Sequence, residues 1–159
     1  MIFMCTFLGD NMDNDIYFMN LALKEAKRAY SYDEVPIGAV IVKNGEIIAK
    51  GYNKKVKTNN VIKHAEIVAI EKACKKLNNW RLNECTIYIT MFPCPMCASA
   101  INQARFKKIV YGTIPNLFDK NIVDNILNDK NYGLPVEIYG GILEDECALL
   151  IKKFFSEKR

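Results

Sequence analysis

The sequence of 159 residues contains a single histidine, a single tryptophan and only one Cys-x-x-Cys pair. A zinc ribbon needs two such pairs, so the lack of a second pair excludes that class of structural protein. No apolar run approaches the roughly 20 residues of a membrane-spanning helix, so we expect no membrane association. Internal repeats, low-complexity tracts and linkers are also absent, which indicates one folding unit.

The N-terminal segment shows none of the features of a secretory signal. Residues 1–8 are apolar, but they lack a basic region and a cleavage site. We expect residues 1–13 to be a flexible N-terminal extension and residues 14–159 to form a single domain. Six cysteines without a secretory signal predict a reducing, cytoplasmic location. The net charge of +4 permits an anionic partner without requiring one.

Two short motifs carry side chains that bind metal: His-x-Glu at residues 64–66 and Pro-Cys-x-x-Cys at residues 93–97. Zinc takes nitrogen and sulfur ligands, and a catalytic zinc site uses three protein ligands and leaves a fourth position for water. We therefore predict that His64, Cys94 and Cys97 bind one Zn²⁺ per chain. Glu66 lies two residues after His64, where its carboxylate can act on the water without binding the metal.

The spacing of the two cysteines predicts that both lie at the start of a helix. Cys94 and Cys97 are three residues apart, so they share one face of a first helical turn. Pro95 between them suits the first helical position. The positive end of a helix favours the thiolate form that binds metal. A second helical pattern opens at His64, so two helix N-termini are expected to meet at the metal.

A Cys-x-x-Cys pair has two other interpretations, a redox couple and part of a structural zinc site. A redox couple leaves His64 and Glu66 without a role. A structural zinc site has no use for Glu66. The catalytic interpretation accounts for all four residues.

Hydrophobic periodicity predicts helices that alternate with strands. Asn44-Gly45 predicts a tight hairpin turn between the first two strands. Such an alternation implies a largely parallel sheet covered by helices on both faces, with the antiparallel hairpin at one end. The expected helices are residues 15–30, 64–77, 95–105, 118–127 and 143–155, and the expected strands are residues 35–42, 46–52, 86–90, 108–111 and 136–139.

With these residues placed, the chain resembles the cytidine-deaminase-like superfamily and, within it, the bacterial tRNA-specific adenosine deaminases. The metal motif is common to the superfamily, whereas the closing Gly-Ile-Leu-x-x-Glu-Cys segment is more typical of the tRNA branch. The resemblance implies an α/β fold, a three-layer α/β/α sandwich around a mixed five-stranded sheet with helices on both faces. The matching segments are residues 34–40, 51–53, 64–66, 93–97 and 141–147.

The resemblance also implies an activity, which is zinc-dependent hydrolytic deamination of the wobble adenosine to inosine in a tRNA anticodon loop. It implies that Asn53 binds the target base or its ribose, that the backbone of Ala65 reads the base edge and that Ile37 packs near the base. Glu66 is implied as the proton shuttle. The expected partners are a tRNA anticodon stem-loop and a second copy of the chain in a homodimer.

The sequence departs from the family pattern at three places, so substrates other than tRNA are alternatives. Phe92 stands before Pro-Cys where the family usually has Glu, residues 59–63 lack the usual Asp-Pro, and residues 114–125 replace a turn rich in small residues. All three are expected near the substrate, so a deaminase of a free base or nucleoside, such as guanine, cytosine or cytidine, is the first alternative. A zinc-bearing RNA-binding protein without turnover is the second, and Glu66 argues against it.

The segment from residue 47 to residue 65 contains no acidic residue. A solvated, lysine-rich loop is the simpler interpretation of this pattern. Because the segment ends beside His64, a surface that faces RNA phosphates is the other interpretation. Its basic residues are Lys50, Lys54, Lys55, Lys57 and Lys63.

Overall fold

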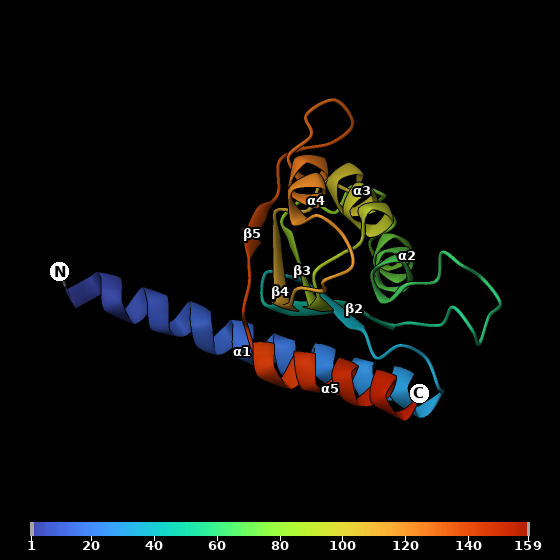
Figure 1. Cartoon of the computed structure of the whole chain (residues 1–159). Helices are drawn as coiled ribbons and strands as arrows, with labels where there is room; N and C mark the ends of the chain where they lie inside the picture. The colour runs from blue at the N-terminus through green and yellow to red at the C-terminus, as the bar shows by residue number, and fades with distance from the viewer. Residues whose placement is uncertain (1, 159) are drawn as a thin grey trace.

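A computed structural model of the chain describes residues 2–158, and Figure 1 shows a sheet between two layers of helices. The order of elements is the one that the periodicity predicts. One helix precedes the hairpin, one follows it, and one follows each of the three later strands. The elements are α1 (Ile2–Ser31), β1 (Gly38–Lys43), β2 (Glu46–Tyr52), α2 (Ala65–Leu77), β3 (Cys85–Met91), α3 (Pro95–Gln103), β4 (Lys108–Thr113), α4 (Lys120–Leu127), β5 (Glu137–Tyr139) and α5 (Glu144–Glu157).

The sheet is mixed, with the strand order β2-β1-β3-β4-β5. β1 pairs antiparallel with β2 and β3, whereas β3, β4 and β5 are parallel to one another. Asn44 and Gly45 both have positive φ, 51° and 76°, as the two central residues of a type I′ hairpin turn require. The predicted antiparallel hairpin at one end of the sheet is therefore confirmed.

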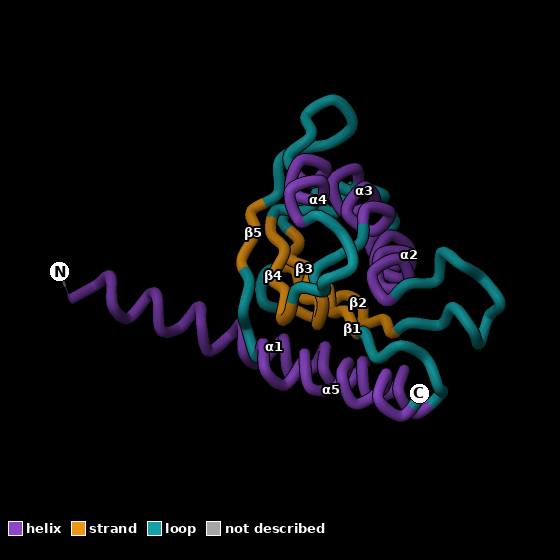
Figure 2. The backbone as a smooth tube through the Cα atoms, in the orientation of Figure 1, coloured by secondary structure: helices purple, strands orange, loops and turns teal. Residues whose placement is uncertain are grey.

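The two faces of the sheet are covered by different helices, and Figure 2 shows α1 and α5 on one side and α2, α3 and α4 on the other. Successive residues of a strand point to opposite faces, and β1 follows this rule. Ala39 and Ile41 pack toward α2, α3 and α4, whereas Val40 and Val42 pack toward α1 and α5. The expected α/β class and three-layer sandwich are confirmed.

The largest difference from the expected elements is the start of α1, at Ile2 instead of Asp15. Asn and Asp at 11, 13 and 14 are weak helix formers, but adding residues to an existing helix costs far less than starting one. Figure 1 shows the early turns of α1 extending beyond the sheet. Flexibility of residues 1–13 stays a prediction. Although α1 is long, no helix within residues 2–158 combines the length and apolarity that crossing a bilayer requires.

A second difference is the start of β1, which is Gly38 and not Val35. Pro36 has no N–H to donate to a neighbouring strand, and it restricts the residue before it. The other predicted boundaries differ from the observed ones by two residues or fewer.

Candidate metal centre

The metal centre lies where two helices begin. His64 is the N-cap of α2 and Cys94 is the N-cap of α3, and both have extended backbones with ψ of 156° and 167°. N-cap side chains usually accept a hydrogen bond from their own helix, but neither of these does. Pro95 occupies the first turn of α3, as predicted. The side chains of His64 and Cys94 are therefore directed at each other and not at their helices.

The three predicted ligands come together at distances that suit zinc. His64 Nδ1 lies 3.6 Å from the Sγ atoms of both Cys94 and Cys97, and the three ligand atoms lie within 4.8 Å of one another. Zn–N and Zn–S bonds of about 2.0 and 2.3 Å at a tetrahedral angle put nitrogen and sulfur about 3.5 Å apart. The residues therefore fit a tetrahedral zinc ion bound through Nδ1 of His64, which the sequence could not specify.

The centre is closed on one side and open on the other. Cys97 is fully buried and Glu66 is 3% exposed, whereas His64 and Cys94 are half-buried. A structural zinc site is closed by four protein ligands, whereas a catalytic site keeps one position for water or substrate. Three ligands with a partly open side match the catalytic arrangement.

Hydrogen bonds among the two thiols and the imidazole shift the pKa values of all three groups. A hydrogen bond from Cys97, followed by one with His64, lowers the pKa of Cys94 to about 4. The Cys97 thiol donates that hydrogen bond, and this role, together with burial, raises the pKa of Cys97. The hydrogen bond with Cys94 raises the pKa of His64. Since metal binds the thiolate and the neutral imidazole, loading this site with zinc releases protons.

Glu66 lies in the first turn of α2, two residues after the His64 ligand. Burial raises the pKa of its carboxyl group to about 7. Its Oε2 atom is buried without a hydrogen-bond partner among the described residues. Native proteins rarely leave a buried carboxylate oxygen unpaired. The atom is thus available to a water or substrate atom at the metal.

The predicted substrate-binding residues lie beside this centre. The backbone N–H of Asn53 donates to the carbonyl of Ile37, and the next residue, Lys54, donates to the carbonyl of Lys63. These bonds bring Asn53 and Ile37 next to the chain that leads into His64. Asn53 is 6% exposed, and its Oδ1 atom has no hydrogen-bond partner among the described residues. Ala65, the first residue of α2, is fully buried.

The three departures from the family pattern occupy different environments. Phe92 is 1% exposed and packs edge-on against Tyr111, with ring centroids 4.8 Å apart, so it is a core residue. Residues 59–63 are part of the loop that the Lys54–Lys63 hydrogen bond closes. Residues 114–117 line a pocket of about 270 Å³ with Met91 and the end of α5. Only the last two segments therefore face solvent.

Glu34 supports the site in a way that the sequence analysis did not foresee. It is 1% exposed, and its Oε1 accepts a hydrogen bond of 2.6 Å from the backbone N–H of Lys57. This bond fixes the lysine-rich loop to the body of the protein. The one available signal was the position of Glu34 at the head of the matching segment 34–40.

Comparison with known proteins places these features in a family. Residues 12–113 match the family described as the cytidine and deoxycytidylate deaminase zinc-binding region. The chain is 42% identical over 149 residues to the tRNA-specific adenosine deaminase of Bacillus subtilis (strain 168), covering 93% of this chain and 92% of the relative. The chain belongs to the zinc-dependent deaminase family. Within it, the chain groups with the tRNA-specific adenosine deaminases.

Solved structures of deaminases superpose on this chain. One from studies of A-to-I editing by tRNA:A34 deaminases at the wobble position of transfer RNA has a TM-score of 0.77 and 37% identity, covering 84% of this chain and 98% of that one. Guanine deaminase from Bacillus subtilis has a TM-score of 0.59 and 41% identity, and the match covers 62% of this chain and 63% of that one. The RNA-editing deaminase thus matches a larger part of both chains than the guanine deaminase does.

Proposed function

We propose that this protein is a zinc-dependent hydrolase that converts the wobble adenosine of a tRNA anticodon loop to inosine. The observation that carries this conclusion is the tetrahedral spacing of His64 Nδ1, Cys94 Sγ and Cys97 Sγ beside an unpaired, buried carboxylate oxygen of Glu66. The relatives that match over nearly the whole chain are tRNA-specific adenosine deaminases, which supports adenosine in tRNA as the substrate.

Zinc bound to these ligands would supply a Lewis acid that activates a water molecule for attack on C6 of adenine. Glu66 would take a proton from that water, pass it to the ring nitrogen and deliver a proton to the leaving amino group. Adenosine and water thus yield inosine and ammonia. The unpaired Oε2 of Glu66 supports this role, because it has a free acceptor position at the site.

Asn53, Ala65 and Ile37 are proposed to hold the base. The free Oδ1 of Asn53 would accept a hydrogen bond from the base or ribose. Its Nδ2 atom already donates to the Val35 carbonyl at 3.4 Å, which fixes the orientation of the amide. The Ala65 backbone lies at the α2 N-terminus next to the ligand His64. Ile37 is half-buried, so one side of it is available to pack against the base.

We further propose that the protein acts as a homodimer in the cytoplasm and that the anticodon stem-loop contacts both subunits. The tRNA substrate supports the cytoplasmic assignment, and so does a centre built on two reduced cysteines. Sedimentation equilibrium of the zinc-loaded protein tests the dimer. A mass equal to one chain of 18.2 kDa at micromolar concentration would contradict it.

The activity is tested by incubating purified protein with total tRNA and, separately, with free guanine, cytosine, adenosine and cytidine. Nucleoside mass spectrometry of the products should show new inosine in tRNA and no deamination of the free compounds. A Glu66→Gln variant, run in parallel, should form inosine about 10²- to 10⁴-fold more slowly than the wild type. Efficient turnover of guanine or cytidine with none of tRNA would replace this proposal by the small-molecule alternative.

A further inference from the structure

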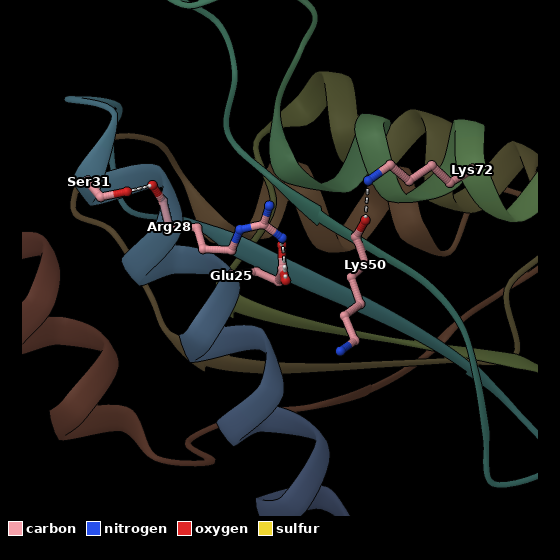
Figure 3. Close-up of polar contacts among 5 residues, drawn as sticks. All are labelled: Glu25, Arg28, Ser31, Lys50 and Lys72. Carbon is pink, nitrogen blue, oxygen red and sulfur yellow. Dashed lines mark hydrogen bonds and ion pairs between the residues drawn. The ribbon is translucent and has the colours of Figure 1, made fainter.

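A group of cationic and aromatic side chains surrounds the edge strand β2, separate from the metal centre. We call it the β2 edge cluster, and it consists of Arg28, Tyr32, Tyr52, Lys54, Lys57 and Lys72. Arg28 lies near the end of α1, Lys72 lies on α2, and the others lie on β2 or in adjacent loops. Figure 3 shows Arg28 and Lys72 approaching β2 from two different helices, with Lys50 on the strand between them.

The two tyrosines form the centre of this cluster. Their rings stack with centroids 5.9 Å apart and an angle of 11° between the planes. Arg28 Cζ and Lys54 Nζ lie 4.9 and 4.8 Å from the Tyr52 centroid, and Lys57 Nζ lies 3.9 Å from that of Tyr32. Aromatic faces attract cations at these distances. The tyrosines therefore hold three positive side chains close together.

The charges of this cluster are only partly neutralised. Arg28 pairs with Glu25 at 3.3 Å, but Lys54, Lys57 and Lys72 have no carboxylate partner within salt-bridge distance among the described residues. Lys72 donates to the carbonyl of Lys50 at 3.0 Å. Burial, followed by the charge of Lys54, lowers the pKa of Lys72. The cations thus repel one another, and a bound anion would relieve that repulsion.

The backbones of Lys54 and Lys57 are held in place before any ligand arrives. The backbone N–H of Lys57 donates to buried Glu34, and that of Lys54 donates to the Lys63 carbonyl. Thr58 donates both its N–H and its hydroxyl to the Lys54 carbonyl. A surface that is already ordered loses less conformational entropy when it binds. Positive charges beside an edge strand can also hinder strand pairing between molecules, but that role requires neither stacked tyrosines nor a hydrogen-bonded loop.

We infer that the β2 edge cluster binds backbone phosphates of the RNA substrate outside the nucleotide that reacts. This inference rests on the proposed function, because it names a second contact for the same substrate. Two connections link the cluster to the metal centre. Tyr52 directly precedes Asn53, and the Lys54–Lys63 hydrogen bond ends one residue before His64. An RNA strand that places its base at the metal would thus continue toward the cluster, where several cations meet its phosphates.

The test is the steady-state kinetics of a Lys54→Ala/Lys57→Ala variant on an anticodon stem-loop at several salt concentrations. At low salt KM should rise by about five- to tenfold while kcat stays unchanged, because the variant lacks two cations that hold the RNA equally before and during the reaction. The slope of log(kcat/KM) against log[salt] should become shallower by about 0.7 for each phosphate that the variant no longer neutralises. Zinc content should equal that of the wild type.

A Lys24→Ala/Lys27→Ala variant is the matched control, since it removes the same charge from exposed positions on α1. It should keep the wild-type KM and salt slope. Tyr32→Phe should also behave as wild type because the ring remains, whereas Tyr32→Ala should raise KM. Equal effects of the two lysine pairs, or a Lys54→Ala/Lys57→Ala variant with unchanged KM and slope, would overturn the inference.

Binding of the stem-loop to wild-type protein, followed by fluorescence anisotropy, separates the two proposals. If the wild type deaminates the stem-loop but the cluster variants bind it as tightly as the wild type does, the inference alone fails. If the wild type neither binds nor deaminates it, the proposed function fails and the inference fails with it.

Discussion

The two faces of the sheet differ in what their helices do. The face covered by α2, α3 and α4 carries all three metal ligands and Glu66, and its core consists largely of Ala, Ile and Leu side chains. The face covered by α1 and α5 has a smaller core, which includes Phe18, Met19 and Tyr88. Both faces pack against the same strands, so the difference in function follows from which helices begin at the metal centre and not from the size of the core.

On the first face, α2 and α3 both begin at the carboxyl ends of strands, where open α/β sheets bind ligands. On the second face, α1 precedes the sheet and α5 follows its last strand, and neither helix contributes to the group formed by His64, Cys94 and Cys97. We expect substitutions on the metal-bearing face to change zinc binding and turnover. In the core of the other face, around Phe18, Met19 and Tyr88, we expect them to change only the free energy of unfolding.

The largest expected effect is that of Cys97→Ala. Removing one of three ligands should abolish zinc binding and, with it, detectable deamination. Elemental analysis of freshly purified protein should find about one zinc per chain in the wild type and almost none in the variant. Cys147→Ala is the matched control, because Cys147 is equally buried but packs on the α1 and α5 face. Loss of zinc from the control would break the proposed division between the faces.

Glu66→Gln comes next in size. The amide has nearly the shape of the carboxylate but cannot accept the proton of the attacking water, so kcat should fall by about 10²- to 10⁴-fold. Zinc content and thermal stability should stay close to those of the wild type. Glu71→Gln, on the exposed side of the same helix, should retain nearly full activity because its exposed pair with Lys63 contributes little. A Glu66→Gln variant with wild-type kcat would disprove the assignment of the proton shuttle.

A pair of glycine substitutions compares the two faces directly. A Cβ atom at Gly51 would lie 2.4 Å from the Ala65 carbonyl of α2, and one at Gly38 would lie 2.0 Å from the Ala22 carbonyl of α1. Each Gly→Ala change should cost about 3 kcal/mol or more of unfolding free energy, because a helix must move. Only Gly51→Ala should also lower zinc content and kcat, since α2 carries His64 and Glu66. Thermal denaturation measures the loss of stability in both variants, and elemental analysis measures their zinc content. An equal loss of zinc from both variants would contradict the prediction that only Gly51→Ala disturbs the metal centre.

The metal-bearing face was also the more predictable from sequence. His64, Glu66, Cys94 and Cys97 could be identified because the members of each pair are only two or three positions apart in the sequence. Cys94 and Cys97, at three positions, share one face of a helical turn. The hairpin followed from Asn44 and Gly45, whose backbone preferences act locally. These features depend on short-range geometry, so a sequence pattern suffices to predict them.

Features that depend on distant contacts were not predictable. The position of Glu34 in the matching segment 34–40 does not reveal that its carboxylate accepts a hydrogen bond from Lys57, 23 residues away. The same holds for Asn102, whose Nδ2 lies within 3.2 Å of the carbonyls of Leu127, Asp129 and Leu134. The stacking of Tyr32 on Tyr52 likewise requires the fold. The predicted start of α1 was too late because helix propensity does not reveal how easily an existing helix continues.

The smallest expected effect is that of Tyr88→Phe, on the α1 and α5 face. The Tyr88 hydroxyl donates a hydrogen bond of 2.7 Å to Asp15, whose other oxygen lies 3.5 Å from Lys108 Nζ. The ring itself is 5% exposed and packs against Phe18, so the variant keeps its apolar packing and loses one bond to a charged group. Such a bond contributes about 1.5 kcal/mol, and the melting temperature should fall by about 3–6 °C. Asp15 keeps Lys108 as a partner, which limits the loss.

Zinc content, kcat and KM should be unchanged in Tyr88→Phe, because Tyr88 contacts α1 and no residue of the metal centre. A drop in kcat or in zinc content without a drop in melting temperature would show that the two faces are coupled through β3.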